Sequence, residues 1–146
     1  PVVCYGKSKV TRYVERNKIS HHTEWIDVWK VFTPYANNIG TELNDDNLNS
    51  FVGTPKSVCT ETYIMIGMDL DLNKTECENI CNYLKTRFAR FMLSLAKTSQ
   101  HATSKTYRFV PMQDFSKPWT DAELYKKYGL TDEEIAFIES MIKPME

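Results

Sequence analysis

Apolar side chains recur at spacings of three and four between Cys77 and Leu95, and this periodicity is the strongest structural signal in the chain. It predicts an amphipathic helix over residues 75–98, begun by a capping box in which Thr75 and Glu78 satisfy free backbone N–H groups. A helix with one apolar face needs a partner layer to cover that face. The apolar row consists of Cys77, Ile80, Cys81, Leu84, Phe88, Phe91, Met92 and Leu95.

Strand-like segments dominate the first half of the chain. Residues 1–6, 25–35 and 57–70 are rich in β-branched and aromatic residues, as is the segment 106–112, and a long Asn-rich loop is predicted over residues 36–57. In the segment 25–35 both alternating sets are largely apolar, which predicts a strand covered on both faces. Gly67 is expected close to the end of the segment 57–70.

The C-terminal segment has helical signals of its own. Thr120–Glu123 and Thr131–Glu134 form two further capping boxes, and Gly129 is placed to end the first of the two short helices. We therefore expect an α+β fold, with a mainly antiparallel sheet packed on one long helix and a small C-terminal helical hairpin. The expected division is an α+β domain at 1–113 and a helical tail at 114–146, docked by Ile135, Ile138, Met141 and Ile142.

Composition limits the classes of protein that need to be considered. A hydrophobic content of 42% and a charged content of 25% are ordinary for a globular domain, and no apolar run approaches the ~20 residues of a membrane span. No secretion signal is visible, so a cytoplasmic setting with four free thiols is expected, with Cys77 and Cys81 buried on the helix. Because the first residue is Pro1 rather than Met, the sequence is interpreted as a fragment of a longer protein.

Catalytic and metal-binding signatures are scarce. The sequence has no glycine-rich phosphate loop, no G-x-S-x-G motif and no H-E-x-x-H motif. Asp69 and Asp71 follow a strand and are interpreted as turn residues, while the neighbouring His21 and His22 are interpreted as surface residues. The sequence therefore predicts no catalytic residue, no metal and no cofactor within this chain.

A polar, cationic segment is the principal candidate for a binding site. Between Lys85 and Arg108 the chain has six basic residues and no acidic residue, and such side chains contact phosphates, while Gln and Arg also contact base edges. A solvated helix face is the competing interpretation, and the net charge of −1 counts against nucleic-acid binding. The candidate DNA-binding residues are Lys85, Arg87, Arg90, Lys97, Ser99, Gln100, His101, Ser104, Lys105 and Arg108.

Residues 55–143 resemble the C-terminal end of bacterial restriction–modification N6-adenine DNA methyltransferases, some of which are fused to type II endonucleases. The most specific part is "YRFVPMQDFSKPWTDAELYKKYGL", residues 107–130. The resemblance implies a target-recognition region that binds double-stranded DNA and contacts the methyltransferase domain of its parent chain. The family's Asn/Asp-Pro-Pro-Tyr/Phe motif and cofactor loop are missing, since "TPYAN" at 33–37 shares only Pro-Tyr. The resemblance thus assigns S-adenosylmethionine to the parent and no methyl transfer to this chain.

Other roles and surfaces remain open at this point. Residues 114–146 contain eight acidic and four basic residues, so the alternative function is a protein-interaction module that docks this acidic tail onto the methylase, the endonuclease or a partner subunit. An enzymatic role for the isolated chain is a third possibility. If the cationic segment does not bind DNA, the basic segment Lys7–Lys18 and the Asn-rich loop Ala36–Ser50 are the alternative recognition surfaces.

Overall fold

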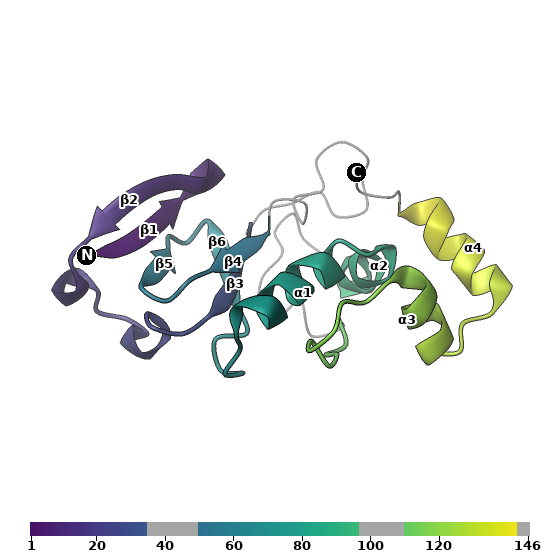
Figure 1. Ribbon diagram of the computed structural model, residues 1–146. Coiled ribbons are helices and arrows are strands. Elements are labelled where there is room, and N and C mark those ends of the chain that lie inside the picture. Colours follow the sequence, from purple (N-terminus) through teal and green to yellow (C-terminus); the bar gives the residue numbers. More distant parts are fainter. Residues whose placement is uncertain (35–49, 97–109, 143–146) are drawn as a thin grey trace.

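Two small three-stranded sheets form one end of the molecule (Figure 1). The computed structural model describes residues 1–34, 50–96 and 110–142. In the first sheet β1 (Val2–Gly6) pairs antiparallel with β2 (Val10–Val14) and parallel with β5 (Ser57–Cys59). In the second sheet β3 (Lys30–Pro34) pairs antiparallel with both β4 (Phe51–Gly53) and β6 (Tyr63–Ile66). Short 3-10 turns occupy Lys7–Lys9, Arg16–Lys18 and Thr23–Trp25.

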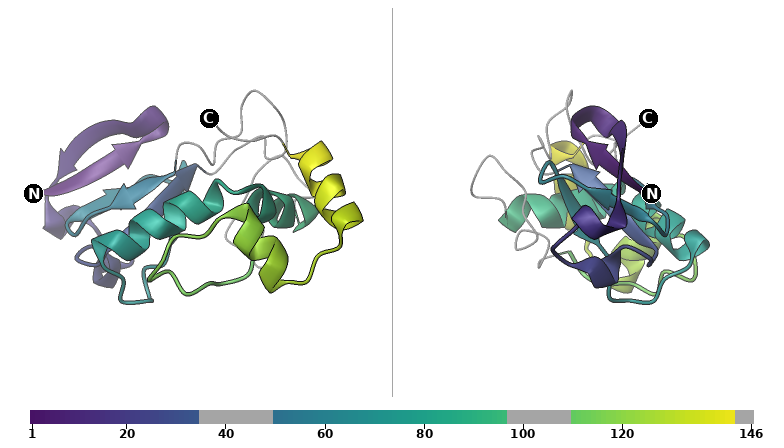
Figure 2. Two further views of the ribbon diagram at one scale, coloured as in Figure 1. Left: turned by 45° about the vertical axis from the view of Figure 1, so that its right-hand side comes forward. Right: turned by 90° about the vertical axis from the view of Figure 1, so that its left-hand side faces the viewer.

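Four helices form the rest of the described chain: α1 (Lys74–Leu84), α2 (Arg87–Ala96), α3 (Asp121–Lys127) and α4 (Asp132–Met141). The expected α+β class with mainly antiparallel pairing is therefore confirmed. The molecule is elongated, with the β1–β2 ribbon at one end and α4 at the other, as two views agree (Figures 1 and 2). None of the helices in the described ranges is long and apolar enough to cross a membrane.

The helix expected over residues 75–98 is divided in two, which corrects the prediction of one long helix. α1 ends at Leu84 and α2 begins at Arg87. Between them the Thr86 hydroxyl donates to the Tyr83 carbonyl (2.7 Å) and accepts from the Ala89 amide (3.1 Å). A threonine side chain that bonds to the backbone competes with helix continuation and caps a new start. Thr86 therefore acts as the N-cap of α2.

The start of α1 and two β segments also differ from expectation. Asn73, rather than Thr75, caps α1: it accepts from the Glu76 amide at 2.8 Å, and Glu76 accepts from the Asn73 amide at 3.0 Å. The strand expected over 57–70 is two strands, β5 and β6, separated by a turn at 60–62, and Gly67 follows the second with φ +81°. The predicted loop 36–57 contains β4 and the first residue of β5, while its residues 36–49 lie outside the described chain.

Most of the remaining local predictions are confirmed. The Thr120–Glu123 and Thr131–Glu134 boxes are both formed, and Gly129 follows α3 with φ +62°. The strand expected over 25–35 is formed only at Lys30–Pro34, because Trp25 ends a 3-10 turn and residues 26–28 form a turn and bend. Within β3, Lys30–Thr33 are buried, as expected for a strand covered on both faces. The strand expected at 106–112 falls mainly outside the described chain, and its described end at 110–111 is not a strand.

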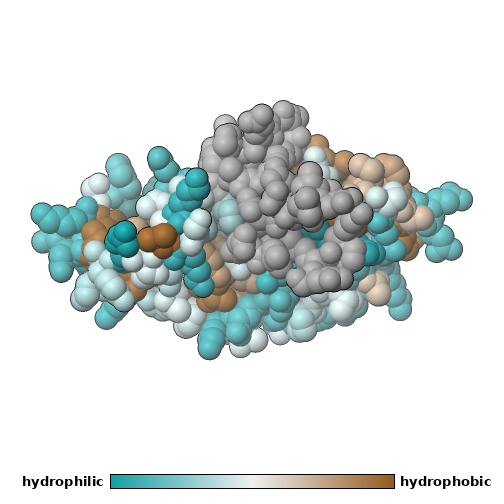
Figure 3. Space-filling view, turned by 90° about the horizontal axis from the view of Figure 1, so that it is seen from above, coloured by the Kyte–Doolittle hydropathy of each residue, from teal (hydrophilic) through white to brown (hydrophobic). Residues whose placement is uncertain are grey.

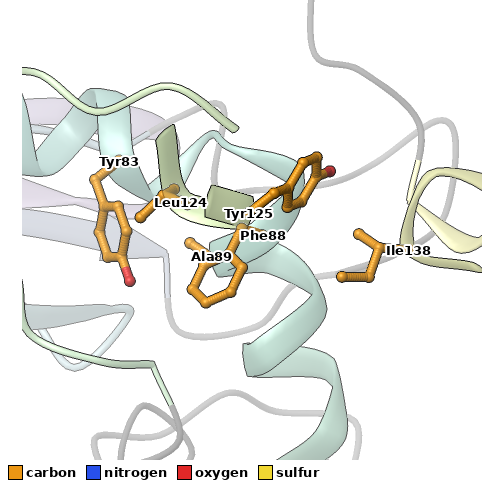
Figure 4. Packing of buried hydrophobic residues seen from close by; sticks show 6 residues of the cluster. All are labelled: Tyr83, Phe88, Ala89, Leu124, Tyr125 and Ile138. Carbon is orange, nitrogen blue, oxygen red and sulfur yellow. The ribbon is translucent and has the colours of Figure 1, made fainter. Parts of the chain in front are cut away.

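Three hydrophobic clusters join these elements. Tyr5, Phe32, Phe51 and Tyr63 hold the two sheets together, with neighbouring ring centroids 4.9–6.4 Å apart. One face of α1 covers the second sheet through Cys77, Ile80, Cys81 and Leu84, which pack with Val31. The third cluster unites α1, α2, α3 and α4 (Figure 4) and consists of Tyr83, Phe88, Ala89, Leu124, Tyr125 and Ile138.

A carboxylate from α3 caps the start of α2. Asp121 accepts from the amides of Arg87 (3.1 Å) and Phe88 (2.9 Å), two groups that lack partners inside their own helix. We expect Asp121→Ala to lower the free energy of unfolding by about 1–2 kcal/mol, because a helix cap and a link between helices are both lost. Asp132→Ala is the matched control, since it removes one of the three first-turn acids of α4 and should cost only about 0.3–1 kcal/mol. Equal losses in urea titrations would contradict the capping role of Asp121.

Candidate nucleic-acid interface

Most of the predicted DNA-binding residues belong to the segment 97–109, which lies outside the described chain. The structure therefore leaves those assignments as predictions. They are Lys97, Ser99, Gln100, His101, Ser104, Lys105 and Arg108. The other three, Lys85, Arg87 and Arg90, lie where α1 ends and α2 begins, and their environments can be compared with the expected exposed helix face.

Arg90 does not lie on an exposed face. Its residue surface is 2% exposed, and its Nε donates to the Thr86 carbonyl at 3.4 Å. The prediction placed residues 75–98 in one continuous helix. In the structure the helix stops at Leu84 and a second helix begins at Arg87, so Arg90 does not share a face with the residues of α1 as predicted. Arg90 is therefore removed from the set of exposed phosphate contacts.

The other two cations at this junction are only partly available. Arg87 forms an ion pair with Glu139 of α4, at 3.2 Å, and 24% of its side chain is exposed. Lys85 is half-buried at the C-cap of α1. The helix face therefore presents one partly exposed lysine and one paired arginine, which is a weaker cationic surface than the sequence predicted.

The described basic surface lies instead on the β1–β2 ribbon and the turn that follows it. Residues 1–14 contain no acidic residue, and Lys7, Lys9 and Arg12 are all exposed, as are Arg16 and Lys18 just beyond β2. Arg16 forms a bidentate ion pair with Asp27, in which two guanidinium nitrogens each lie 2.8 Å from a carboxylate oxygen. The Arg16 hydrogen bond holds the pKa of Asp27 below its ordinary value. No ion pair joins Lys7, Arg12 or Lys18 to another described residue, so their charges are available to a ligand.

The tip of the ribbon is held by contacts from the second sheet. Ser8 and Lys9 both have φ of +60°, a left-handed conformation that costs a non-glycine residue on the order of 1 kcal/mol. The Lys9 amide donates to the Tyr63 hydroxyl at 2.8 Å, and the Lys9 ammonium lies 4.5 Å from the centroid of the Phe51 ring. These contacts fix the turn that presents Lys7 and Ser8.

Strand register determines which side chains share a face of the ribbon. Tyr5 packs its ring on Phe32 and Phe51, so its face of the ribbon points toward the second sheet. Arg12 pairs in register with Cys4 and therefore projects from the opposite face. Tyr13 belongs to the edge strand β2, and 72% of its surface is exposed. An arginine and an aromatic ring thus project from opposite faces of one strand.

His22, Asp69 and Asp71, which were considered from the sequence as possible metal ligands, have other contacts or roles in the structure. His22 stacks on Trp25, with ring centroids 3.8 Å apart, and the Trp25 Nε1 donates to Asp69 at 3.3 Å. Asp71 has φ +53° in the turn before α1, in keeping with its assignment as a turn residue. Over the described residues, no group of three or more His, Cys, Asp and Glu side chains is arranged to hold a metal ion.

All four cysteines are free, as predicted, and Cys77 and Cys81 are buried. Burial raises the pKa of Cys77 to about 12 and that of Cys59 and Cys81 to about 11. These cysteines are therefore protonated near neutral pH. Because the thiolate and not the thiol is the effective nucleophile, they are poorly suited to nucleophilic chemistry. They serve as small core residues.

No family model, no curated protein and no solved structure matches this chain.

Proposed function

We propose that this chain binds double-stranded DNA and that the β1–β2 ribbon is one of the surfaces that contacts it. The observation that carries the proposal is the acid-free ribbon, whose turn and strand β2 are exposed. On it, Lys7 and Arg12 have no ion-pair partner among the described residues. Lys18 extends this basic surface beyond the end of β2.

The chemistry of the exposed edge suits a duplex. Because β1 also pairs with β5, the part open to a ligand is the edge strand β2 and the turn between β1 and β2. Lysine and arginine on this edge supply the type of phosphate contact that dominates affinity for DNA. Arg12 and the exposed hydroxyls of Thr11 and Tyr13 are side chains of the types that contact phosphates and base edges. A rigid tip, held by Tyr63 and Phe51, would reduce the entropy lost when the ribbon is ordered on DNA.

The distribution of charge favours one end of the molecule for DNA over the other. The ribbon end is basic, whereas the described residues 128–142 at the α4 end contain four acids and no lysine or arginine. The net charge of −1 is therefore unevenly distributed, with a basic ribbon end and an acidic α4 end among the described residues. The cationic segment 97–109 remains a second predicted contact surface.

The biological role that we propose is sequence recognition within a restriction–modification adenine methyltransferase. The support is the resemblance of residues 107–130 to that family together with the basic ribbon. On this proposal S-adenosylmethionine and the methylation chemistry belong to another part of the parent enzyme, and this chain alone transfers no methyl group.

The proposal predicts that Lys7→Ala/Arg12→Ala weakens binding to duplex DNA on the order of tenfold at low salt, because two phosphate contacts are lost. The slope of log affinity against log salt should fall by about 0.9 for each contact. Fluorescence anisotropy with a labelled duplex measures both quantities. Lys74→Ala/Lys126→Ala is the control, since it removes the same charge from exposed helical positions. Equal weakening by the two pairs, or duplex binding that neither pair alters, would place the DNA surface elsewhere.

A further inference from the structure

α4 has apolar residues on two sides, although only one side is needed for the core. Ile135, Ile138 and Ile142 face inward, with Ile138 only 4% exposed and in contact with the helical cluster. Phe137 and Met141, one helical turn apart, are 55% and 54% exposed. The expectation that Met141 belongs to the docking stripe is therefore wrong, because it lies roughly 100° around the helix from Ile142.

The outer side of α4 forms a continuous surface that could receive another helix. Glu133, Phe137 and Met141 follow one another at spacings of four and therefore lie in one row. Ala136 and Ser140 lie beside this row, are exposed and are small enough to permit close approach. The ring of Phe137 contacts Phe91 of α2 edge to face, with ring centroids 5.9 Å apart, and this contact holds the Phe137 ring in place. The apolar surface of α4 therefore extends beyond the inward face to a neighbouring, exposed side of the helix.

Charge indicates what kind of molecule fits this surface. Asp132 and Glu133 are exposed in the first turn, and the described segment 128–142 has no lysine or arginine. In the space-filling view, hydrophobic surface is visible at the α4 end of the molecule and also at the opposite end, near the sheets (Figure 3). DNA would be repelled here, whereas a protein surface with basic residues beside apolar ones would be attracted.

We propose that the outer face of α4 is a docking site for a helix of a partner protein, a helix that is apolar on one side and flanked by lysine or arginine. Phe137 and Met141 are the apolar anchors, and Asp132 and Glu133 select the basic flank. The site stands apart from the DNA-binding proposal, because it uses different residues at the opposite end of the molecule.

The test uses a labelled 18-residue amphipathic helix built from leucine and lysine, and a matching helix built from leucine and glutamate. We expect the full chain to bind the lysine peptide and not the glutamate peptide. Phe137→Ser/Met141→Ser should weaken that binding about tenfold, as expected for two anchor residues. Val10→Ser/Tyr13→Ser is the matched control, because it removes two exposed apolar side chains at the other end and should leave peptide affinity unchanged.

A second variant separates charge from packing. Asp132→Asn/Glu133→Gln keeps the shape of the helix and should weaken binding of the lysine peptide while reducing its salt dependence. Unchanged affinity in both α4 variants would overturn the proposal, as would equal binding of the two peptides. Self-association of the wild-type chain that the Phe137→Ser/Met141→Ser variant abolishes would assign the face to a second copy instead.

Discussion

Phe88→Ala should lower the free energy of unfolding by about 3–5 kcal/mol, the largest loss that we expect from a single truncation in this chain. Phe88 is 3% exposed in the helical cluster (Figure 4). Its ring stacks on that of Tyr128, with centroids 5.1 Å apart. Truncation would remove the ring from its contacts with the helical cluster and with Tyr128 at the end of α3, and would leave a cavity. Urea titrations followed by circular dichroism measure the change, with the m value used to check that the native state stays compact.

Leu95→Ala provides the control on the same helix. Leu95 belongs to the same apolar period as Phe88, yet it is 58% exposed, so its truncation should change stability by no more than about 0.5 kcal/mol. Periodicity alone would assign the two residues equal importance. Similar losses at both positions would mean that the C-terminal turn of α2 packs more tightly than its exposure indicates.

Local signals predicted the helices well because their causes are local. The capping boxes at Thr120 and Thr131 join residues three apart, and the structure forms both. The division of the long helix depends partly on Asp121, whose carboxylate reaches the start of α2 across 33 and 34 positions of sequence. Thr86 does not stand out in the sequence, because the strong apolar period continues on both sides of it.

The candidate site was predicted less completely, because exposure depends on tertiary packing. Arg90 occupies a position that a straight helix would expose, and the break removes it from that face. Phe137 and Met141 show the reverse case, since the inward isoleucines of α4 leave both of them outside. The basic segment Lys7–Lys18 was recognisable from its charge alone. Its display on a ribbon depends on the Tyr63 contact with Lys9, which lies 54 positions away in sequence.

Lys30→Ala should destabilise the protein by about 2–4 kcal/mol, although lysine is ordinarily a surface residue. Lys30 is completely buried in β3, and its ammonium donates to the carbonyls of Trp25 (3.1 Å), Ile26 (2.9 Å) and Thr54 (3.2 Å). These three bonds tie the 3-10 turn before β3 and the segment after β4 to the second sheet. Alanine would remove the donor and the alkyl chain together, leaving polar oxygens beside a cavity.

Lys30→Met keeps an unbranched side chain of similar length and removes the ammonium, so it tests the charge separately from the packing. The stability difference between this variant and the wild type should depend on pH. Burial lowers the pKa of Lys30 from 10.5 to about 8, against the opposing influence of Asp27. Between these two values the unfolded chain binds more protons than the folded chain, so this residue makes the unfolding free energy rise with pH. The stability of wild type minus that of Lys30→Met should therefore increase from pH 8 to pH 10, by at most about 1.4 kcal/mol per unit. The buried thiols lower stability above pH 9 because their pKa values are raised. The subtraction cancels the contribution of Cys81, whereas Cys59 and Cys77 interact with the Lys30 charge and cancel only in part. A difference that stays flat or falls over this range would mean that the three carbonyls offset the burial of the ammonium.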